Sequence, residues 1–158
     1  MVHNRNFFCT IDTKLRSFYL KIFHKAIALN HFLFKIKRKD SPNCTLCDKK
    51  EETMVHLFCD CEKVAPIWHD LLALISQKCD FKINVTTFEK LFGMSDDKFL
   101  TYLFLLMKYH VYTCKFNNSL PSIATFKSFV KKQKDTEYFL AKNRNKLPAH
   151  FKKLRFTI

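Results

Sequence analysis

Glycine is almost absent from this chain of 158 residues, which contains one glycine and four prolines. An all-β fold needs turn residues at short intervals, so this shortage argues against one. Eighteen phenylalanines, five tyrosines and one tryptophan provide ample apolar material for a core. We therefore expect a mainly α fold, a single small helical domain that spans residues 1–158.

Long apolar segments are missing as well. The longest run, near residues 103–107, is far shorter than the roughly 20 residues that span a bilayer. The first residues lack the uninterrupted apolar stretch of a signal peptide. We therefore expect an intracellular protein, in the nucleus or the cytoplasm, with no membrane partner. In a reducing compartment, clustered cysteines favour metal or redox chemistry over structural disulfides.

Acidic residues are scarce: the chain has 14 aspartates and glutamates but 28 lysines and arginines, which gives a formal net charge of +14. The basic residues gather at both ends of the chain, whereas residues 41–70 hold more acidic than basic side chains. Two basic segments on one small fold suit the phosphates of RNA or DNA. We predict phosphate contacts from Lys35, Lys37, Arg38 and Lys39, and from Lys127, Lys131, Lys132 and Lys134.

Familiar catalytic motifs are also lacking. The chain contains no glycine-rich phosphate loop, no dinucleotide-binding glycines and no credible pair of nucleophile and base. Asp96 and Asp97 are adjacent, as metal-binding aspartates of polymerases are, but their flanks predict a turn followed by a helix. We therefore interpret this pair as the start of a helix.

Apolar residues recur at helical spacing in the first half of the chain. Their three- and four-residue spacing predicts one continuous helix over residues 14–35 with a single buried face, and Pro42 lies beyond its end. A second helix is expected to open at Pro66 and to bury Trp68.

The second half predicts two further helices. Ser95 is placed to cap a helix that is apolar nearly all round, with Asp96 and Asp97 in its first turn, and we expect this helix to be central and buried. Another begins near Ser122. Residues 80–94 fit a short extended piece followed by one helical turn. We expect the basic tail, residues 141–158, to be ordered only in part.

Soft metal ligands concentrate between residues 44 and 61. Cys44 and Cys47 have the spacing that lets two thiolates from one turn bind the same zinc ion. His56 follows, and Cys59 and Cys61 compete for the fourth position. On a continuous helix Cys59 shares a face with His56, whereas Cys61 lies roughly 140° away. A helix that ends early would bring Cys61 back, so the spacing leaves both open.

Four such ligands would fill the coordination shell of Zn²⁺, which indicates a structural site and not a hydrolytic one. The metal would staple a polar loop between two helices, within a module spanning residues 40–72. It would supply folding energy that this loop cannot gain from apolar burial.

The stretch from Asp40 to Leu71 resembles the zinc-binding module near the C-terminus of LINE-type, non-LTR retrotransposon reverse transcriptases. The family pattern has two cysteines, a Glu-Thr pair, a histidine followed by two apolar residues, a cysteine and a tryptophan. The matching residues are Cys44, Cys47, Glu52, Thr53, His56, Leu57, Phe58, Cys61 and Trp68. The basic helical segments on either side also look like the surroundings of this module.

The resemblance implies that Cys61 is the fourth ligand, because the family places its last cysteine five positions after the histidine. It implies a non-catalytic C-terminal fragment that binds zinc and nucleic acid and positions template RNA or target DNA by phosphate contacts. The catalytic aspartates and the endonuclease domain of the full-length proteins are not found here, so we expect no enzymatic activity. The rest of a reverse transcriptase is a further expected partner. The alternative is a protein-interaction module that docks on a reverse transcriptase or a host factor through its apolar helices.

Overall fold

The computed structural model describes residues 9–79, 84–94 and 97–144. They form α1 (Thr13–Phe23), α2 (Asn30–Lys35), the π-helix η2 (His56–Asp60), α3 (Ala65–Cys79), α4 (Thr87–Phe92), α5 (Lys98–Phe116) and α6 (Ile123–Arg144). Within these ranges there is no β-strand, only an isolated antiparallel bridge between Asn43 and Glu51. The predicted mainly α fold is confirmed.

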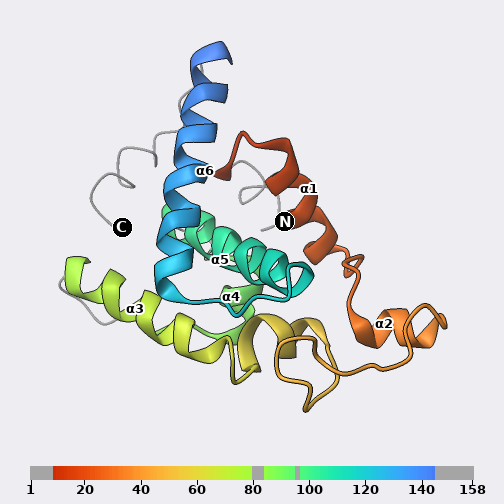
Figure 1. Cartoon of the computed structure of the whole chain (residues 1–158). Helices are drawn as coiled ribbons and strands as arrows, with labels where there is room; N and C mark the ends of the chain where they lie inside the picture. Colours follow the sequence, from red (N-terminus) through yellow and green to blue (C-terminus); the bar gives the residue numbers. More distant parts are fainter. Residues whose placement is uncertain (1–8, 80–83, 95–96, 145–158) are drawn as a thin grey trace.

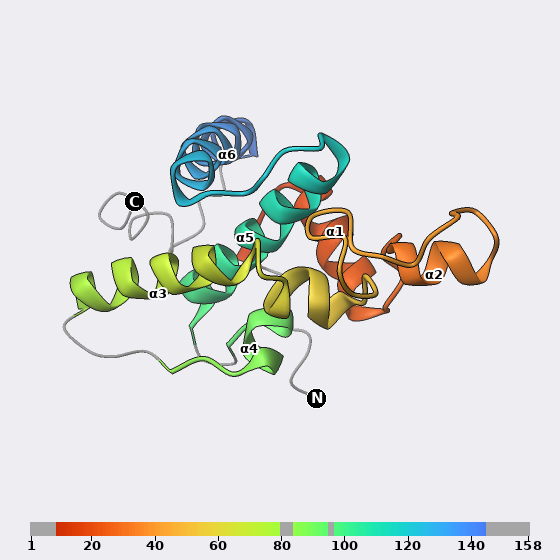
Figure 2. The same cartoon turned by 60° about the horizontal axis from the view of Figure 1, so that its bottom comes forward.

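Helix α5 lies at the centre of the fold, as its continuous apolar character predicts. Residues 99–108 are buried on every side of the helix. Helices α1, α4, α6 and η2 pack against α5, and Figure 2 shows α4 and α6 on opposite sides of it. The cap of α5 is Asp97, whose carboxylate accepts hydrogen bonds from the backbone N–H groups of Phe99 and Leu100. Asp97, predicted in the first turn, is therefore the cap itself, whereas the predicted cap Ser95 and its neighbour Asp96 lie outside the described residues.

The single helix predicted over residues 14–35 is two helices. Lys25 adopts a left-handed conformation with φ of 53° just after α1 ends. Its N–H bonds to the carbonyl of Ile22, and the N–H of Ala26 bonds to that of Lys21 at 2.7 Å. This Schellman motif stops the helix. Helix α2 therefore stands out to one side of the other helices (Figure 1).

The last helix ties the beginning of the described chain to its end. Ser122 caps α6 by accepting a hydrogen bond from the N–H of Thr125. Farther along, Glu137 accepts hydrogen bonds from the hydroxyl of Thr10 and from the backbone N–H of Ile11. Of the predicted basic tail, residues 141–144 belong to α6 and the rest lies outside the described residues.

Candidate metal centre

The turn that carries Cys44 and Cys47 is held by backbone hydrogen bonds. The N–H of Cys44 bonds to the carbonyl of Lys50, and the N–H of Asp48 bonds to the carbonyl of Cys44, each at 2.8 Å. Asp48 takes a left-handed conformation with φ of 54°, which reverses the chain directly after Cys47. The turn therefore presents both sulfur atoms from one side of a short loop.

A π-helical turn supplies the other two candidate ligands. His56 begins η2, and the N–H of Cys61 bonds to the carbonyl of His56 at 2.8 Å, five residues back. Just before this turn, the hydroxyl of Thr53 accepts a hydrogen bond from the N–H of His56. π-Turns of this kind are often found at functional sites. The wider turn brings Cys61, and not Cys59, to the side of His56.

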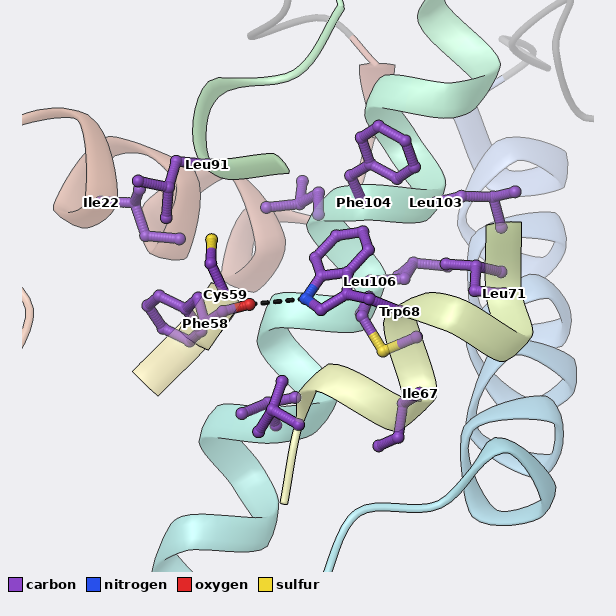
Figure 3. Packing of buried hydrophobic residues seen from close by; sticks show 14 of the residues in the cluster. Ile22, Phe58, Cys59, Ile67, Trp68, Leu71, Leu91, Leu103, Phe104 and Leu106 are labelled. Atoms are coloured by element: carbon purple, nitrogen blue, oxygen red, sulfur yellow. Dashed lines mark hydrogen bonds between the residues drawn. The ribbon is translucent and has the colours of Figure 1, made fainter. Parts of the chain in front are cut away.

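Cys59 lies instead in the hydrophobic core. Figure 3 shows it beside Phe58, Ile22 and Leu91. Burial raises the pKa of its thiol to about 11, which keeps the group protonated at neutral pH. Its sulfur is not among the four ligand atoms that the structure brings together.

The four ligand atoms of Cys44, Cys47, His56 and Cys61 all lie within 4.8 Å of one another. The sulfur atoms of Cys44 and Cys61 are 3.9 Å apart, and Sγ of Cys47 is 3.3 Å from Nε2 of His56. A tetrahedral zinc ion with Zn–S bonds of about 2.3 Å separates its sulfur ligands by about 3.8 Å. The arrangement thus fits Zn²⁺ with every corner filled by the protein. No second group of this kind occurs among the residues that the structure describes.

The electrostatic surroundings favour a thiolate at this centre. The pKa of Cys44 is lowered to about 5, chiefly by a hydrogen bond from the Cys61 thiol and, against the effect of burial, by the backbone N–H groups of Cys47 and Leu46. The same pairing raises the pKa of Cys61. Zinc binding would release the proton that remains on the Cys61 thiol. Outside the cluster, Lys49 donates to Glu62 at 2.8 Å and ties the first turn to the chain after Cys61.

A buried carboxylate, that of Glu52, holds the metal loop in place through hydrogen bonds. Glu52 is fully buried and accepts hydrogen bonds from the backbone N–H of Asn30 at 2.8 Å and of Thr45 at 2.9 Å. It also forms an ion pair with Lys115, which is itself buried at the end of α5 and donates to the carbonyl of Ala28. Thr45 lies between the first two ligands. This pair joins the metal loop to the central helix.

The spacing of residues in the sequence indicates no role for Glu52, and nothing in the sequence points to Lys115. The only sequence signal for Glu52 is its place in the family pattern. Lys115 looks like one more charged residue near the end of a helix, and 63 positions separate the two partners.

Trp68 connects the π-turn to the core. Its indole N–H donates to the carbonyl of Phe58 at 2.6 Å, and its ring packs edge-on against Phe104 with ring centroids 5.2 Å apart (Figure 3). Since a π-turn leaves backbone carbonyls without their usual partner, the indole satisfies one of them. The tryptophan thus sets how α3 meets η2.

The residues predicted to contact phosphate form two separate clusters. Lys35 ends α2, and Lys37, Arg38 and Lys39 follow it, all exposed. On α6, Lys127, Lys131 and Lys132 are exposed and Lys134 is half-buried. Helices α2 and α6 lie apart in both views (Figures 1 and 2), so the clusters do not form one continuous patch. Their contact with nucleic acid stays a prediction.

None of the helices that the structure describes is long and apolar enough to cross a membrane.

Comparison with protein families finds a similarity for the first part of the chain. Residues 1–68 match the model of a family described as zinc-binding in reverse transcriptase. The match includes the four candidate ligands and ends at Trp68, before α4, α5 and α6. No match was found to a curated protein or to a solved structure. The matched family is a zinc-binding one and not a catalytic polymerase domain, so residues 1–68 are similar to the zinc-binding module of reverse transcriptases.

Proposed function

We propose that this chain is a non-catalytic, zinc-stapled module that binds nucleic acid, and that it derives from a LINE-type, non-LTR reverse transcriptase. The observation that carries the proposal is the closed set of three thiols and one imidazole in the segment similar to reverse transcriptase zinc modules. A site with four protein ligands holds the fold together and leaves zinc no open position for chemistry. The module would act beside a polymerase in the nucleus or the cytoplasm.

The charge of the chain supports nucleic acid as the partner. Its formal net charge is +14, while the acidic residues gather in and around the metal loop. The exposed clusters on α2 and α6 would hold template RNA or target DNA by phosphate contacts, which carry no sequence information. Because the two clusters lie on separate elements, they would orient the bound nucleic acid as well as attract it.

We also propose that residues 9–144 act as one domain. The Glu52–Lys115 pair joins the metal loop to α5, and the bonds of Glu137 to Thr10 and Ile11 join the N-terminal segment to α6. Both sets of contacts cross the end of the family match at Trp68. A fragment that ends there would lose the buried partner of Glu52.

Elemental analysis of purified protein tests the metal centre. One zinc per chain is expected in the parent and in Cys59→Ser, and none in Cys61→Ser. Zinc retained by Cys61→Ser and lost by Cys59→Ser would overturn the assignment of the fourth ligand.

A salt titration tests the binding partner. If phosphate contacts supply most of the affinity, a log–log plot of the affinity for RNA or DNA against salt concentration should be a falling straight line. Replacing Lys35, Lys37 and Lys39 by glutamine should make the slope of that line less steep. Binding that does not respond to salt would refute a phosphate-led role.

The alternative, a protein-interaction module, is favoured by one observation on α2. Phe32 and Phe34 on this short helix, and Ile36 just after it, expose between 45% and 54% of their surface. Apolar side chains on a projecting helix suit docking on a reverse transcriptase or a host factor. Such docking would resist salt, which separates it from the first proposal.

A further inference from the structure

A groove with a volume of about 500 Å³ lies between α1 and the C-terminal half of α5, which pack against each other. Sites for small molecules commonly have volumes of about 300–1,000 Å³. The groove lies outside the metal loop and outside both predicted lysine clusters. Its lining therefore needs an explanation of its own.

A row of aromatic rings from both helices lines the groove. Phe18 packs against Tyr109 at 5.0 Å and against Tyr112 at 5.3 Å between ring centroids. Tyr112 in turn packs edge-on against Phe116 at 4.8 Å. Phe116 ends this row and exposes 62% of its surface. An exposed ring held by a rigid neighbour offers a face on which a planar group can stack.

The wall of the groove formed by α1 is also basic and carries hydroxyl groups. Lys14, Ser17 and Lys21 lie on α1, are exposed and line the groove, while no acidic side chain lines it. Neither lysine takes part in an ion pair within the described residues. The two are seven residues apart on one helix, or about 10.5 Å along its axis, which is roughly the rise of three stacked nucleotides.

We propose that this groove binds an unpaired stretch of RNA or DNA, with phosphates on Lys14 and Lys21 and one base stacked on Phe116. The strand must be unpaired, because a base inside a duplex is already stacked on both faces and cannot reach the ring. The inference rests on the proposed function in that it takes nucleic acid as the partner. It adds the place where a base, and not only the phosphate backbone, is held.

The test compares matched variants for binding of a fluorescent 12-nucleotide poly-dU strand and a duplex of the same length. Phe116→Leu keeps apolar bulk but removes the aromatic face. Phe88→Leu is its control, since Phe88 on α4 exposes 60% of its surface and also packs against a neighbouring ring. Both rings are exposed, so neither change should unfold the protein, which zinc content and thermal melting verify.

Loss of the stacking ring should weaken binding of the single strand by about 5- to 150-fold and leave duplex binding unchanged. Phe88→Leu should match the parent. The double variant Lys14→Gln/Lys21→Gln should reduce the single-strand salt slope by about 1.4, since each lost phosphate contact lowers it by about 0.7. Phe116→Leu should leave that slope as it is.

Different results would overturn different claims. If the parent binds the strand and Phe116→Leu binds as the parent does, the groove is not the site, and the proposed function stands on the lysine clusters alone. If Lys14→Gln/Lys21→Gln lowers the slope no more than a Lys98→Gln/Lys142→Gln control, whose lysines are exposed elsewhere, the basic wall has no such role. A parent that binds neither strand nor duplex would refute the inference and the proposed function together.

Discussion

The buried ion pair between Glu52 and Lys115 should hold the metal loop against the central helix, and replacing Lys115 by methionine tests this. Methionine retains most of the apolar stem of the lysine and removes its charge, together with its hydrogen bond to the carbonyl of Ala28. The carboxylate of Glu52 would then stay fully buried, with the N–H groups of Asn30 and Thr45 as its remaining donors.

The size of the effect follows from this loss of one partner. Removing one side of a buried ion pair costs about 3–5 kcal/mol. Because two backbone donors remain on Glu52, we expect the lower end, about 3 kcal/mol. For a chain of this length that lowers Tm by about 6–12 °C. The free energy of unfolding of the double variant Glu52→Gln/Lys115→Met should fall by less than that of Lys115→Met, because no unpaired charge stays buried.

Urea denaturation of the zinc-loaded protein measures the free energy of unfolding of each variant. Lys108→Met is the matched control: Lys108 is also buried on α5, but its one described hydrogen bond is to the carbonyl of Leu91. With no carboxylate to leave unpaired, this change should be neutral or stabilising. A cost below about 1 kcal/mol for Lys115→Met, or equal effects at the two positions, would refute the reasoning.

Three further predictions follow from local features. Trp68→Phe removes the hydrogen bond to the carbonyl of Phe58 and part of a buried ring, so the free energy of unfolding in urea should fall by about 2–3 kcal/mol, and an unchanged value would contradict this role. Burial lowers the pKa of Lys108 from 10.5 to about 7, so the unfolded chain binds more protons than the folded one above pH 7. The parent should therefore gain stability relative to Lys108→Met between pH 7 and pH 9, by about 2 kcal/mol, and parallel pH curves would exclude a depressed pKa. Lys25→Gly removes the backbone strain of a lysine in the left-handed conformation, so the free energy of unfolding should rise by about 0.5–1 kcal/mol. A fall in the free energy of unfolding would show that the position is unstrained.

Much of this protein could be predicted from local patterns. The shortage of glycine and proline and the spacing of apolar residues indicated helices, and the continuous apolar character of residues 99–108 predicted that α5 is buried. The C-x2-C pair and the histidine that follows narrowed the metal ligands to five residues. Each of these features depends on residues that are close together in the chain. Local sequence patterns can therefore predict them.

The fourth ligand shows where local reasoning stops. An α-helical turn would place Cys59 near His56, and only the resemblance to a family favoured Cys61. The π-turn brings Cys61 into position, and the indole of Trp68 supports that turn from another helix. Regular helix geometry cannot predict an irregular turn that depends on a residue farther along the chain.

The helical class, the basic character and the candidate ligands can all be predicted from the sequence, because each follows from composition or short spacing. Only the folded structure reveals the burial of Glu52 against Lys115 and the groove between α1 and α5. Each of these joins residues from separate elements, and in the groove some ninety positions separate Lys21 and Tyr112. Contacts over such separations arise only when the whole core packs, because no local preference of either segment encodes them.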